Sequence, residues 1–330
     1  MPENSRRPRL TPAMADIRRA VRESLQDLVE GDLVLVALSG GPDSLALAAG
    51  TAFEAPRAGL RAGAIIIDHG LQEGSDGIAE RAAEQAKALG LDPVIVRRVT
   101  VGDTGGPEAA ARQARYAELM RVRKETGASA ILLGHTLDDQ AETVLLGLAR
   151  GSGAESLWGM HPIIGPMRRP LLQIRRDSTH SACEDQGLEP WCDPHNMDER
   201  YTRVRIRQRV LPVLDEELGG GVALALTRTA DQLREDAEAL AHFAQEQIGD
   251  LVEHAEAGLS LEAEALRANP PALRQRIIRL AVQSEFHVSL TRQQTLEVSR
   301  LVTDWHGQGP LDLPGLKVHR EGRRIYFTAA

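Results

Sequence analysis

Residues 32–44 read Asp-Leu-Val-Leu-Val-Ala-Leu-Ser-Gly-Gly-Pro-Asp-Ser, and this stretch decides the fold. Leu33 to Leu38 is an apolar run with the length and composition of a strand buried on both faces of a parallel sheet. The glycines that follow allow a sharp turn in which backbone N–H groups can approach a ligand. Pro42 fits the first turn of a helix. The stretch therefore predicts a strand, a tight loop and a helix whose positive N-terminal end binds an anion, usually phosphate.

Strands and helices are predicted to alternate as far as residue 150. The further predicted strands are residues 62–70, 93–99 and 130–134, and the helices run from Asp43 to Phe53, from Ser75, from Glu108 to about Glu125 and after His135. This alternation predicts an α/β fold with a parallel, doubly wound sheet and helices on both faces. Ligands bind at the carboxyl ends of strands in such sheets, where Ser39, Asp68 and His135 are expected.

The pattern changes in the second half of the chain. A fifth strand is expected near residues 163–172 and a short helix near residues 175–186. From about Gly219 the composition shifts to Ala, Leu, Glu and Gln, and a long helix begins. Pro270-Pro271 starts another helix, and residues 309–327 have the pattern of a small β unit. We therefore expect a second, smaller and mainly helical domain.

Composition limits the class of protein. With 330 residues, 42% hydrophobic and 26% charged, the chain has the profile of a globular protein long enough for two domains. Residues 1–10 lack the apolar core of a signal peptide and are expected to be a disordered tail. No stretch approaches the roughly 18 consecutive apolar residues of a membrane span, which predicts a cytoplasmic protein with no membrane partner.

Cysteine content and net charge restrict the partners further. Cys183 and Cys192 are too few and too far apart for a disulfide framework or a Cys-x-x-Cys metal or iron–sulfur site. The net charge of −8 means that a nucleic-acid partner would require a local basic surface.

The loop itself has a recognisable motif. No lysine follows it as in the Gly-x-x-x-x-Gly-Lys-Ser/Thr loop. Ser-Gly-Gly-Pro-Asp-Ser instead resembles the PP-loop, Ser-Gly-Gly-x-Asp-Ser, of ATP pyrophosphatases, which split ATP between its α and β phosphates. Amides and hydroxyls can hold the leaving pyrophosphate, and Asp43 can bind Mg²⁺. The alternative is a corner that merely requires small residues. The candidate ATP-binding residues are Ser39, Gly40, Gly41, Pro42, Asp43, Ser44, Asp68 and His69.

A second group of polar residues spans residues 134–143. Thr136 and Asp139 have the spacing of a capping box, so part of this pattern can be explained as a helix start. Asp139 and Glu142 lie about 60° apart around a helix, beside the predicted buried face. Two carboxylates and His135 at the end of a strand can bind a cation, although plain first-turn acids remain the alternative.

Several motifs occur in the order found in one family. They are the PP-loop-like sequence, Asp68-His69-Gly70-Leu71, Ala111-Arg112-Gln113-Ala114-Arg115-Tyr116, Gly134-His135, residues 138–143, Arg150-Gly151-Ser152-Gly153, Arg169-Pro170-Leu171-Leu172, Trp191-Cys192-Asp193-Pro194 with Asn196, and residues 201–207. Together they resemble tRNA(Ile)-lysidine synthetase between about residues 32 and 214. One position departs from that pattern, because Val204 stands where the family often has asparagine.

The resemblance implies a reaction and its substrates. ATP, with Mg²⁺, would activate C2 of the wobble cytidine of tRNA(Ile) with a CAU anticodon, and the ε-amine of free L-lysine would displace AMP to give lysidine. His135 is then a candidate for proton handling, and Asp139 and Glu142 for binding the lysine ammonium. Asp43 and Asp139 are the candidate metal ligands. The resemblance leaves a homodimer open.

Two sets of arginines are candidates for binding anions. Arg112 and Arg115 lie three residues apart on one helix face and can reach the ATP phosphates or the adenylated intermediate. Arg203, Arg205 and Arg207 belong to a run without acids and are the expected tRNA contacts. Solvated helix faces are the alternative for both sets.

The resemblance also defines the expected domains and the rival functions. Residues 1–22 would be a tail and the start of the first helix, residues 23–218 the PP-loop ATP-binding catalytic domain with a connecting segment, and residues 219–330 a helical domain in contact with tRNA. The rivals are a PP-loop tRNA thiolase, which generally needs active-site cysteines, and a non-catalytic nucleotide-binding protein. A glutamine-dependent synthetase of the same superfamily is a weaker rival, because it would require a glutaminase region and this sequence shows none.

Overall fold

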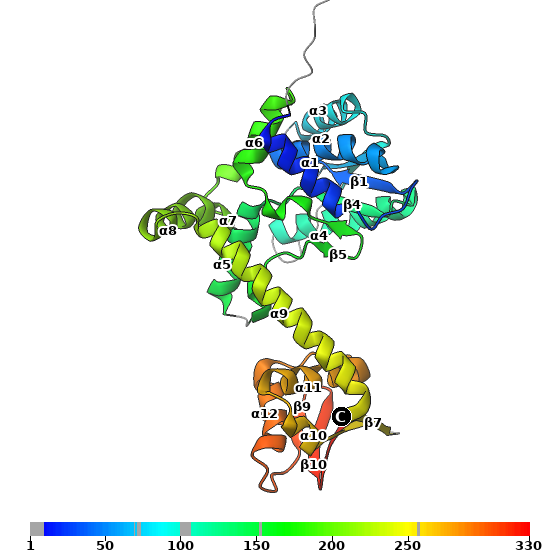
Figure 1. Cartoon of the computed structure of the whole chain (residues 1–330), viewed down its shortest axis with the longest axis vertical. Coiled ribbons are helices and arrows are strands. Elements are labelled where there is room, and N and C mark those ends of the chain that lie inside the picture. The colour runs from blue at the N-terminus through cyan, green and yellow to red at the C-terminus, as the bar shows by residue number, and fades with distance from the viewer. Residues whose placement is uncertain (1–9, 69, 71–73, 100–106, 152–153, 256–257) are drawn as a thin grey trace, which may run out of the picture. The chain divides into compact units, whose positions relative to one another are not determined.

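The computed structural model describes residues 10–68, 70, 74–99, 107–151, 154–255 and 258–330. The chain divides into two compact units, Met1–Asp231 and Gln232–Ala330, which we call the N-terminal and C-terminal units (Figure 1). The division falls within a helix and not at Gly219, where we expected the second domain to begin. Most of the expected tail, residues 1–9, and the candidate His69 lie outside the described residues.

The N-terminal unit is built on a six-stranded sheet in the order β3-β2-β1-β4-β6-β5. Its strands are β1 (Leu33–Ala37), β2 (Arg61–Asp68), β3 (Val94–Arg98), β4 (Ala130–Leu133), β5 (Ile163–Ile164) and β6 (Met167–Arg168). All neighbours pair in parallel except β5, which pairs antiparallel with β6. The predicted doubly wound parallel sheet is confirmed. The single strand expected over residues 163–172 is instead two short strands joined by a turn.

The helices described in this unit are α1 (Pro12–Ser24), α2 (Pro42–Glu54), α3 (Ser75–Ala88), α4 (Pro107–Thr126), α5 (Leu137–Arg150), α6 (Arg176–Asp185), α7 (Thr202–Arg205) and α8 (Leu211–Leu218). Helices cover both faces of the sheet, since α1, α2, α3 and α6 contribute to the cluster on one face and α4 to the cluster on the other. A π-helical turn, η5 (Ile206–Val210), separates α7 from α8. Local signals fix several ends, because Thr11 caps α1, Thr136 caps α5, and Gly151 ends α5 in the left-handed conformation.

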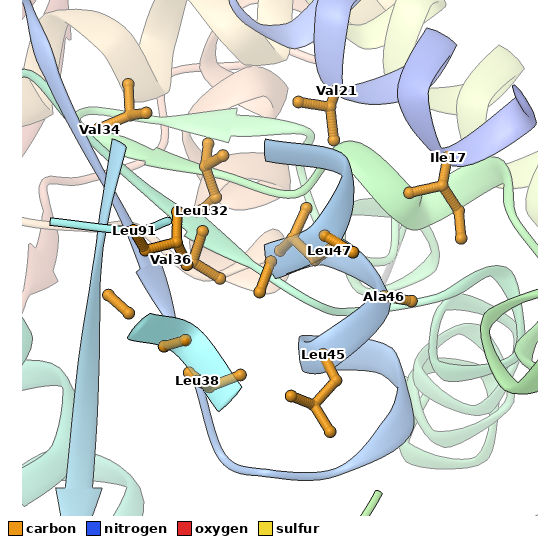
Figure 2. Packing of buried hydrophobic residues seen from close by; sticks show 14 of the residues in the cluster. Ile17, Val21, Val34, Val36, Leu38, Leu45, Ala46, Leu47, Leu91 and Leu132 are labelled. Atoms are coloured by element: carbon orange, nitrogen blue, oxygen red, sulfur yellow. The ribbon is translucent and has the colours of Figure 1, made fainter. Parts of the chain in front are cut away.

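Strand β1 contributes to the core on both faces of the sheet. Val34 and Val36 belong to one cluster with residues of α1, α2 and α3, and Figure 2 shows both in this cluster, which also contains Leu45 and Leu47 of α2. Leu33 and Leu35, on the opposite face, belong to a second cluster with residues of α4 and β4. This alternation explains why the run is apolar at every position, as expected for a strand covered on both sides.

The strand order places the candidate site. The chain moves outward from β1 to β2 and β3 and then returns to the other side of β1 as β4. Connections leave β1 and β4 in opposite directions at this switch point, which opens a crevice at their carboxyl ends. The loop after β1 and His135 after β4 lie at that edge.

The C-terminal unit combines helices with an antiparallel sheet in the order β7-β8-β11-β10-β9. Its elements are the end of α9 (Val222–Leu251), β7 (Val252–Ala255), β8 (Gly258–Glu262), α10 (Ala263–Ala268), α11 (Pro271–Phe286), α12 (Arg292–Thr303), β9 (Leu311–Leu313), β10 (Leu316–Glu321) and β11 (Arg324–Ala329). The β unit expected at residues 309–327 is present, whereas β7 and β8 were not predicted. At Gly258, φ is +145° and a Cβ would lie 2.1 Å from the Phe327 carbonyl oxygen, so the pairing of β8 with β11 requires glycine.

Within the described ranges, no helix has both the length and the apolar character needed to cross a membrane.

Candidate active site

The loop between β1 and α2 is shaped by its own polar groups. Gly40 has φ +82°, in the left-handed region that favours glycine, and its carbonyl oxygen accepts the N–H of Trp191 at 2.9 Å. The Ser44 hydroxyl lies 3.1 Å from that of Ser39 and donates to the Gly41 carbonyl at 2.9 Å. Among the residues that the structure describes, no side chain makes a capping hydrogen bond to α2, which leaves first-turn amides available to a ligand. The loop therefore offers N–H groups and a positive helix end to an anion.

The end of β4 lies directly against this loop. A Cβ on Gly134 would lie 3.1 Å from the carbonyl atoms of Asp43 and from Cα of Ser44, a tighter contact than most Cβ atoms make, so glycine allows this approach without a shift of the loop. The next residues form the predicted capping box, in which the Asp139 carboxylate accepts the Thr136 N–H at 2.9 Å. Asp139 is thus both part of a helix cap and a neighbour of the loop, which combines the two interpretations that the sequence left open.

Helix α6 brings a third helix N-terminus to the same place. The Arg176 N–H donates to Asp138 Oδ2 at 2.8 Å, and the Thr179 hydroxyl donates to the carboxylate of Asp43. Cys183 of the same helix donates to the Pro42 carbonyl at 3.3 Å. The positive ends of α2, α5 and α6 meet here, and acidic side chains at these ends are favoured electrostatically.

Two arginines and three acids form what we call the carboxylate cluster: Asp43, Asp139, Glu142, Arg176 and Arg207. The Arg176 guanidinium lies 2.7 Å from Asp139 Oδ1 and 3.6 Å from both Asp43 Oδ2 and Glu142 Oε1. Arg207 Nε lies 2.7 Å from Glu142 Oε1, and its NH2 group lies 3.5 Å from Asp139 Oδ1. Arg176 therefore connects the loop to the two carboxylates of α5.

Burial and charge act against each other in this cluster. Burial raises the pKa of Asp43 despite its hydrogen bond from Thr179, and burial also raises the pKa of Glu142 despite Arg207. Burial works in the same direction at Asp139, but Arg176, the Thr136 amide and Arg207 outweigh it, so the pKa of Asp139 is lowered. Neighbouring acids likewise overcome burial to raise the pKa of Arg176. Asp139 is hence the firmly ionised carboxylate, whereas Glu142 takes up a proton more readily.

His135 lies among arginines on the other side of Asp139. Burial, reinforced by Arg115 and Arg169, lowers the pKa of His135 to about 3 despite the attraction of Asp139. Its Nδ1 is buried and has no hydrogen-bond partner within the described residues, and the same is true of Nε in Arg115 and Arg169. Arg169 is only 6% exposed, and it donates to the His161 carbonyl at 2.7 Å. Neutral His135 and these guanidinium groups form a positively charged surround.

Arg112 and Arg115 of α4 share one aromatic neighbour. Arg112 donates to the Tyr116 hydroxyl at 3.1 Å, and the guanidinium carbons of Arg112 and Arg115 lie 4.8 and 5.5 Å from the Tyr116 ring centre. Burial alone would raise the pKa of Tyr116, but Arg112, Arg115 and Arg169 lower it. Arg115 is partly buried near His135, whereas Arg112 is exposed and adds its charge from the surface of α4.

The predicted tRNA arginines separate into two environments. Arg207 pairs with Glu142, and Arg203 donates to the Thr143 hydroxyl at 3.1 Å, so both contact α5. Arg205 donates to the backbone carbonyls of residues 199 and 200 and lines an open hollow of about 490 Å³ together with Arg209. Val204, at the position where the family often has asparagine, is buried.

Asp68 lies at the carboxyl end of β2 and is buried. Its carboxylate accepts the Gly70 N–H at 2.8 Å and lies 3.7 Å from Arg98 Nε. These contacts connect the end of β2 to the turn that follows it and to the end of β3. Its predicted neighbour His69 lies outside the described residues.

The donor atoms fit Mg²⁺ at Asp43 better than at Asp139. Among the described residues, no three His, Cys, Asp or Glu side chains are grouped to hold a metal by themselves. Mg²⁺ commonly takes one or two carboxylates and completes its shell with water and substrate phosphates. Asp43, in the first turn of α2, can supply such a carboxylate through Oδ2, which lies 3.6 Å from Arg176, beyond hydrogen-bond distance. Both oxygens of Asp139 accept hydrogen bonds, Oδ2 from Thr136 and Oδ1 from Arg176.

The two cysteines differ in environment, and the buried one does not resemble a nucleophile. Burial raises the pKa of Cys183 to about 12, and Cys192 is an exposed free thiol. A thiol with so high a pKa carries little of the reactive thiolate.

Several important residues were not predicted from sequence. Arg176 and Thr179 contact Asp43 from a helix more than a hundred positions away, and no local pattern distinguishes them from other residues of a helix start. Arg169 could have been found from sequence, because it begins the Arg-Pro-Leu-Leu motif quoted above, but we assigned it no function there. Trp191 likewise lies in a quoted motif, and its backbone contacts the loop.

Comparison with protein families gives two matches. A PP-loop domain matches residues 14–214, which include β1 to β6 and the carboxylate cluster. A TilS substrate binding domain matches residues 261–326 in the C-terminal unit.

Known proteins are similar to the chain over most of its length. The tRNA(Ile)-lysidine synthase of Leifsonia xyli is 60% identical over 301 residues, 91% of each chain, and that of Thermobifida fusca is 52% identical over 318 residues, 95% of each chain. The solved structure of the U34-tRNA thiolase NcsA from Methanococcus maripaludis covers 68% of this chain and 80% of its own, with a TM-score of 0.57 and 21% identity, a likeness of fold alone. The identities over nearly whole chains show that the protein belongs to the tRNA(Ile)-lysidine synthase family.

Proposed function

We propose that this protein is a ligase that joins free L-lysine to C2 of the wobble cytidine of tRNA(Ile) with a CAU anticodon. The C2 oxygen attacks the α-phosphorus of ATP and pyrophosphate leaves. The lysine ε-amine then attacks C2, and AMP leaves with that oxygen. One observation carries the proposal: Arg176 joins Asp43, in the loop, to Asp139 and Glu142, so the sites for pyrophosphate and for an amine are adjacent.

The loop supports the first step. The first-turn amides of α2 and the hydroxyls of Ser39 and Ser44 can hold the leaving pyrophosphate, which bears several negative charges. Mg²⁺ bound by Asp43 and by phosphate oxygens would neutralise part of this charge.

The arginine surround of His135 supports the same step from the other side. Arg112, Arg115 and Arg169 place positive charge around His135, at the carboxyl end of β4. Charge that develops at the α-phosphate during adenylation is stabilised by such fixed cations in a partly buried site. No cysteine chemistry is required, in contrast to a thiolase.

The carboxylate cluster supports the second step. The lysine ε-ammonium has an ordinary pKa of about 10.4 and must lose a proton before it attacks. Asp139 remains ionised and can bind the ammonium, while Glu142, with its raised pKa, is the better proton acceptor. His135, with a pKa of about 3, is neutral and a weak base. We therefore propose that His135 forms hydrogen bonds to the substrate, and that Glu142, not His135, accepts the proton.

A tRNA substrate agrees with the family and with the match of the C-terminal unit to a substrate binding domain. Arg205 and Arg209 border an open hollow with Val210, Val213 and Leu214, a combination of cationic and apolar groups suited to nucleotides. We propose these residues, with Arg203, as contacts to the anticodon loop. The identity of the tRNA, a cytoplasmic location and a homodimer stay predictions.

One incubation tests the proposal. The protein is mixed with ATP, Mg²⁺, lysine and a CAU-anticodon tRNA(Ile) transcript, and digested nucleosides are analysed by mass spectrometry. We expect a cytidine heavier by lysine minus water, and none when lysine is omitted or when the transcript carries a different wobble base. Absence of this nucleoside, alongside an active relative as control, would reject the proposal.

A further inference from the structure

A second pocket opens next to the carboxylate cluster. It has a volume of about 260 Å³ and lies between the N-terminal ends of α5 and α6, the turn η5, α8 and the first turn of α9. Glu142 lines it from α5 and Asp215 from α8, so it lies entirely within the N-terminal unit. The pocket is therefore in direct contact with a carboxylate that we assign to the amine.

The lining has three kinds of surface. Asp138, Glu142 and Asp215 supply three carboxylates, and Arg175, Arg176 and Arg207 supply three cations. Leu211, Pro212 and Ala223 supply an apolar wall. A free amino acid that has a long aliphatic stem and a terminal ammonium needs all of these, because it carries two ammonium groups, one carboxylate and a run of methylenes.

The three arginines of the lining differ in whether they already have an ion-pair partner. Arg176 and Arg207 are paired with Asp139 and Glu142. Arg175, in contrast, is exposed, and its side chain makes no hydrogen bond or ion pair within the described residues. A carboxylate entering the pocket thus meets one available guanidinium, that of Arg175.

Two carboxylates of the lining differ in their neighbours. Glu142 is fully buried and connects through Arg176 to Asp43 of the loop, so it faces the side on which the base would be adenylated. Asp215 lines the pocket from α8, where its Oδ1 accepts the Val222 N–H at 2.8 Å and its Oδ2 has no partner within the described residues. With the reacting amine at Glu142, Asp215 is a carboxylate that remains for a second ammonium group.

We propose that Arg175 binds the α-carboxylate of the lysine substrate and Asp215 its α-ammonium, so that the pocket selects an α-amino acid over a simple amine. The inference rests on the proposed function and adds residues that recognise the non-reacting end of the substrate. The apolar wall holds the methylene stem, and Glu142, the buried carboxylate of the lining, receives the ε-ammonium on the side of Asp139.

Lysine analogues that lack one group each test this assignment. L-lysinamide has no carboxylate and 6-aminohexanoate has no α-amine, but both keep the ε-amine. The KM of each nucleophile is measured with the full chain, ATP, Mg²⁺ and the CAU transcript, using the modified nucleoside as product. We expect each analogue to show a KM about tenfold or more above that of lysine, the effect of losing one charge-assisted contact.

Two variants identify the residues. Arg175→Gln is expected to raise the KM of lysine about tenfold and leave that of lysinamide unchanged, because the amide never used the guanidinium. Asp215→Asn is expected to raise the KM of lysine similarly and leave that of 6-aminohexanoate unchanged. Asparagine keeps an oxygen that can accept the Val222 N–H, so α9 retains its cap. Glu216→Gln, a neighbouring exposed position outside the pocket lining, is the matched control and should change nothing.

Other results would overturn the assignment. If the unmodified protein had the same KM for the analogues as for lysine, the pocket would not recognise the α-carbon end of the substrate. In Arg175→Gln, an equal rise in the KM of lysine and of lysinamide would mean that Arg175 does not contact the carboxylate. In Asp215→Asn, an equal rise in the KM of lysine and of 6-aminohexanoate would mean that Asp215 does not contact the α-amine. A variant that loses all turnover would also contradict the assignment. If the unmodified protein makes no lysidine from lysine itself, the proposed function fails, which is a different result from unchanged analogue ratios.

Discussion

Replacement of Arg176 by methionine removes the cation shared by the three acids of the carboxylate cluster. Methionine fills similar space without charge, so the change leaves Asp43 and Asp139 buried with one partner fewer. Removing one member of a buried ion pair costs roughly 3–5 kcal/mol. Arg176 is 19% exposed, and Arg207 still pairs with Glu142, so we expect the lower end, about 3 kcal/mol.

The cost should depend on pH with a defined sign. In the unmodified protein the pKa of Asp139 is lowered, so its stabilising contribution is present above the unfolded pKa of about 3.9 and is lost only as pH falls through the folded value. Without Arg176, burial dominates and raises the pKa of Asp139, so protonation relieves part of the cost in mildly acidic solution. The destabilisation should therefore be larger at pH 7.5 than at pH 5.

Thermal unfolding of both proteins at the two pH values measures this effect. About 3 kcal/mol in a domain of this size corresponds to a Tm lower by about 6–12 °C at pH 7.5. Arg209→Met is the control, because its pair with Glu199 is exposed and contributes about 0–1 kcal/mol. A Tm change for Arg176→Met no larger than that of the control, or one that is equal at both pH values, would refute the role given to Arg176.

Three further predictions concern activity. Glu142→Ala should raise the KM of lysine much more than that of ATP in steady-state assays, and equal effects would contradict its place at the amine. Asp43→Ala should abolish adenylation measured as pyrophosphate exchange into ATP, so retained exchange would exclude the metal role. tRNA binding, measured by filter retention between 50 and 200 mM salt, should weaken steeply because phosphate contacts release counterions, and a flat response would remove Arg203, Arg205 and Arg209 from the interface.

The residues of the candidate site differ in how far the sequence could predict them. Ser39 to Ser44 and the capping residues Thr136 and Asp139 lie in short stretches whose conformation is determined by nearby glycine, proline and hydroxyl groups. The role of Arg207 could not be predicted in this way. The arginine-rich sequence around Arg207 suggested a basic surface. In the structure, Arg207 lies in η5 and its side chain binds Glu142, a residue 65 positions away in the sequence.

The C-terminal unit shows the same limit. Its last two strands are joined by a short turn and were expected, since their pairing is local. Strands β7 and β8 were missed because β8 pairs with β11, more than sixty positions later, and nothing in residues 252–262 indicates that partner.

The sequence by itself determined the parallel sheet, the PP-loop at its edge and the family, because periodicity and short motifs are properties of neighbouring residues. Only the tertiary structure decided which charges meet. Arg176 and Thr179 reach Asp43, and Asp215 reaches the pocket beside Glu142, because the sheet and its crossover helices bring distant segments to one edge. The same packing buries these groups beside charged neighbours, and burial together with those charges separates the pKa values of Asp139, Glu142 and His135 from their reference values in water.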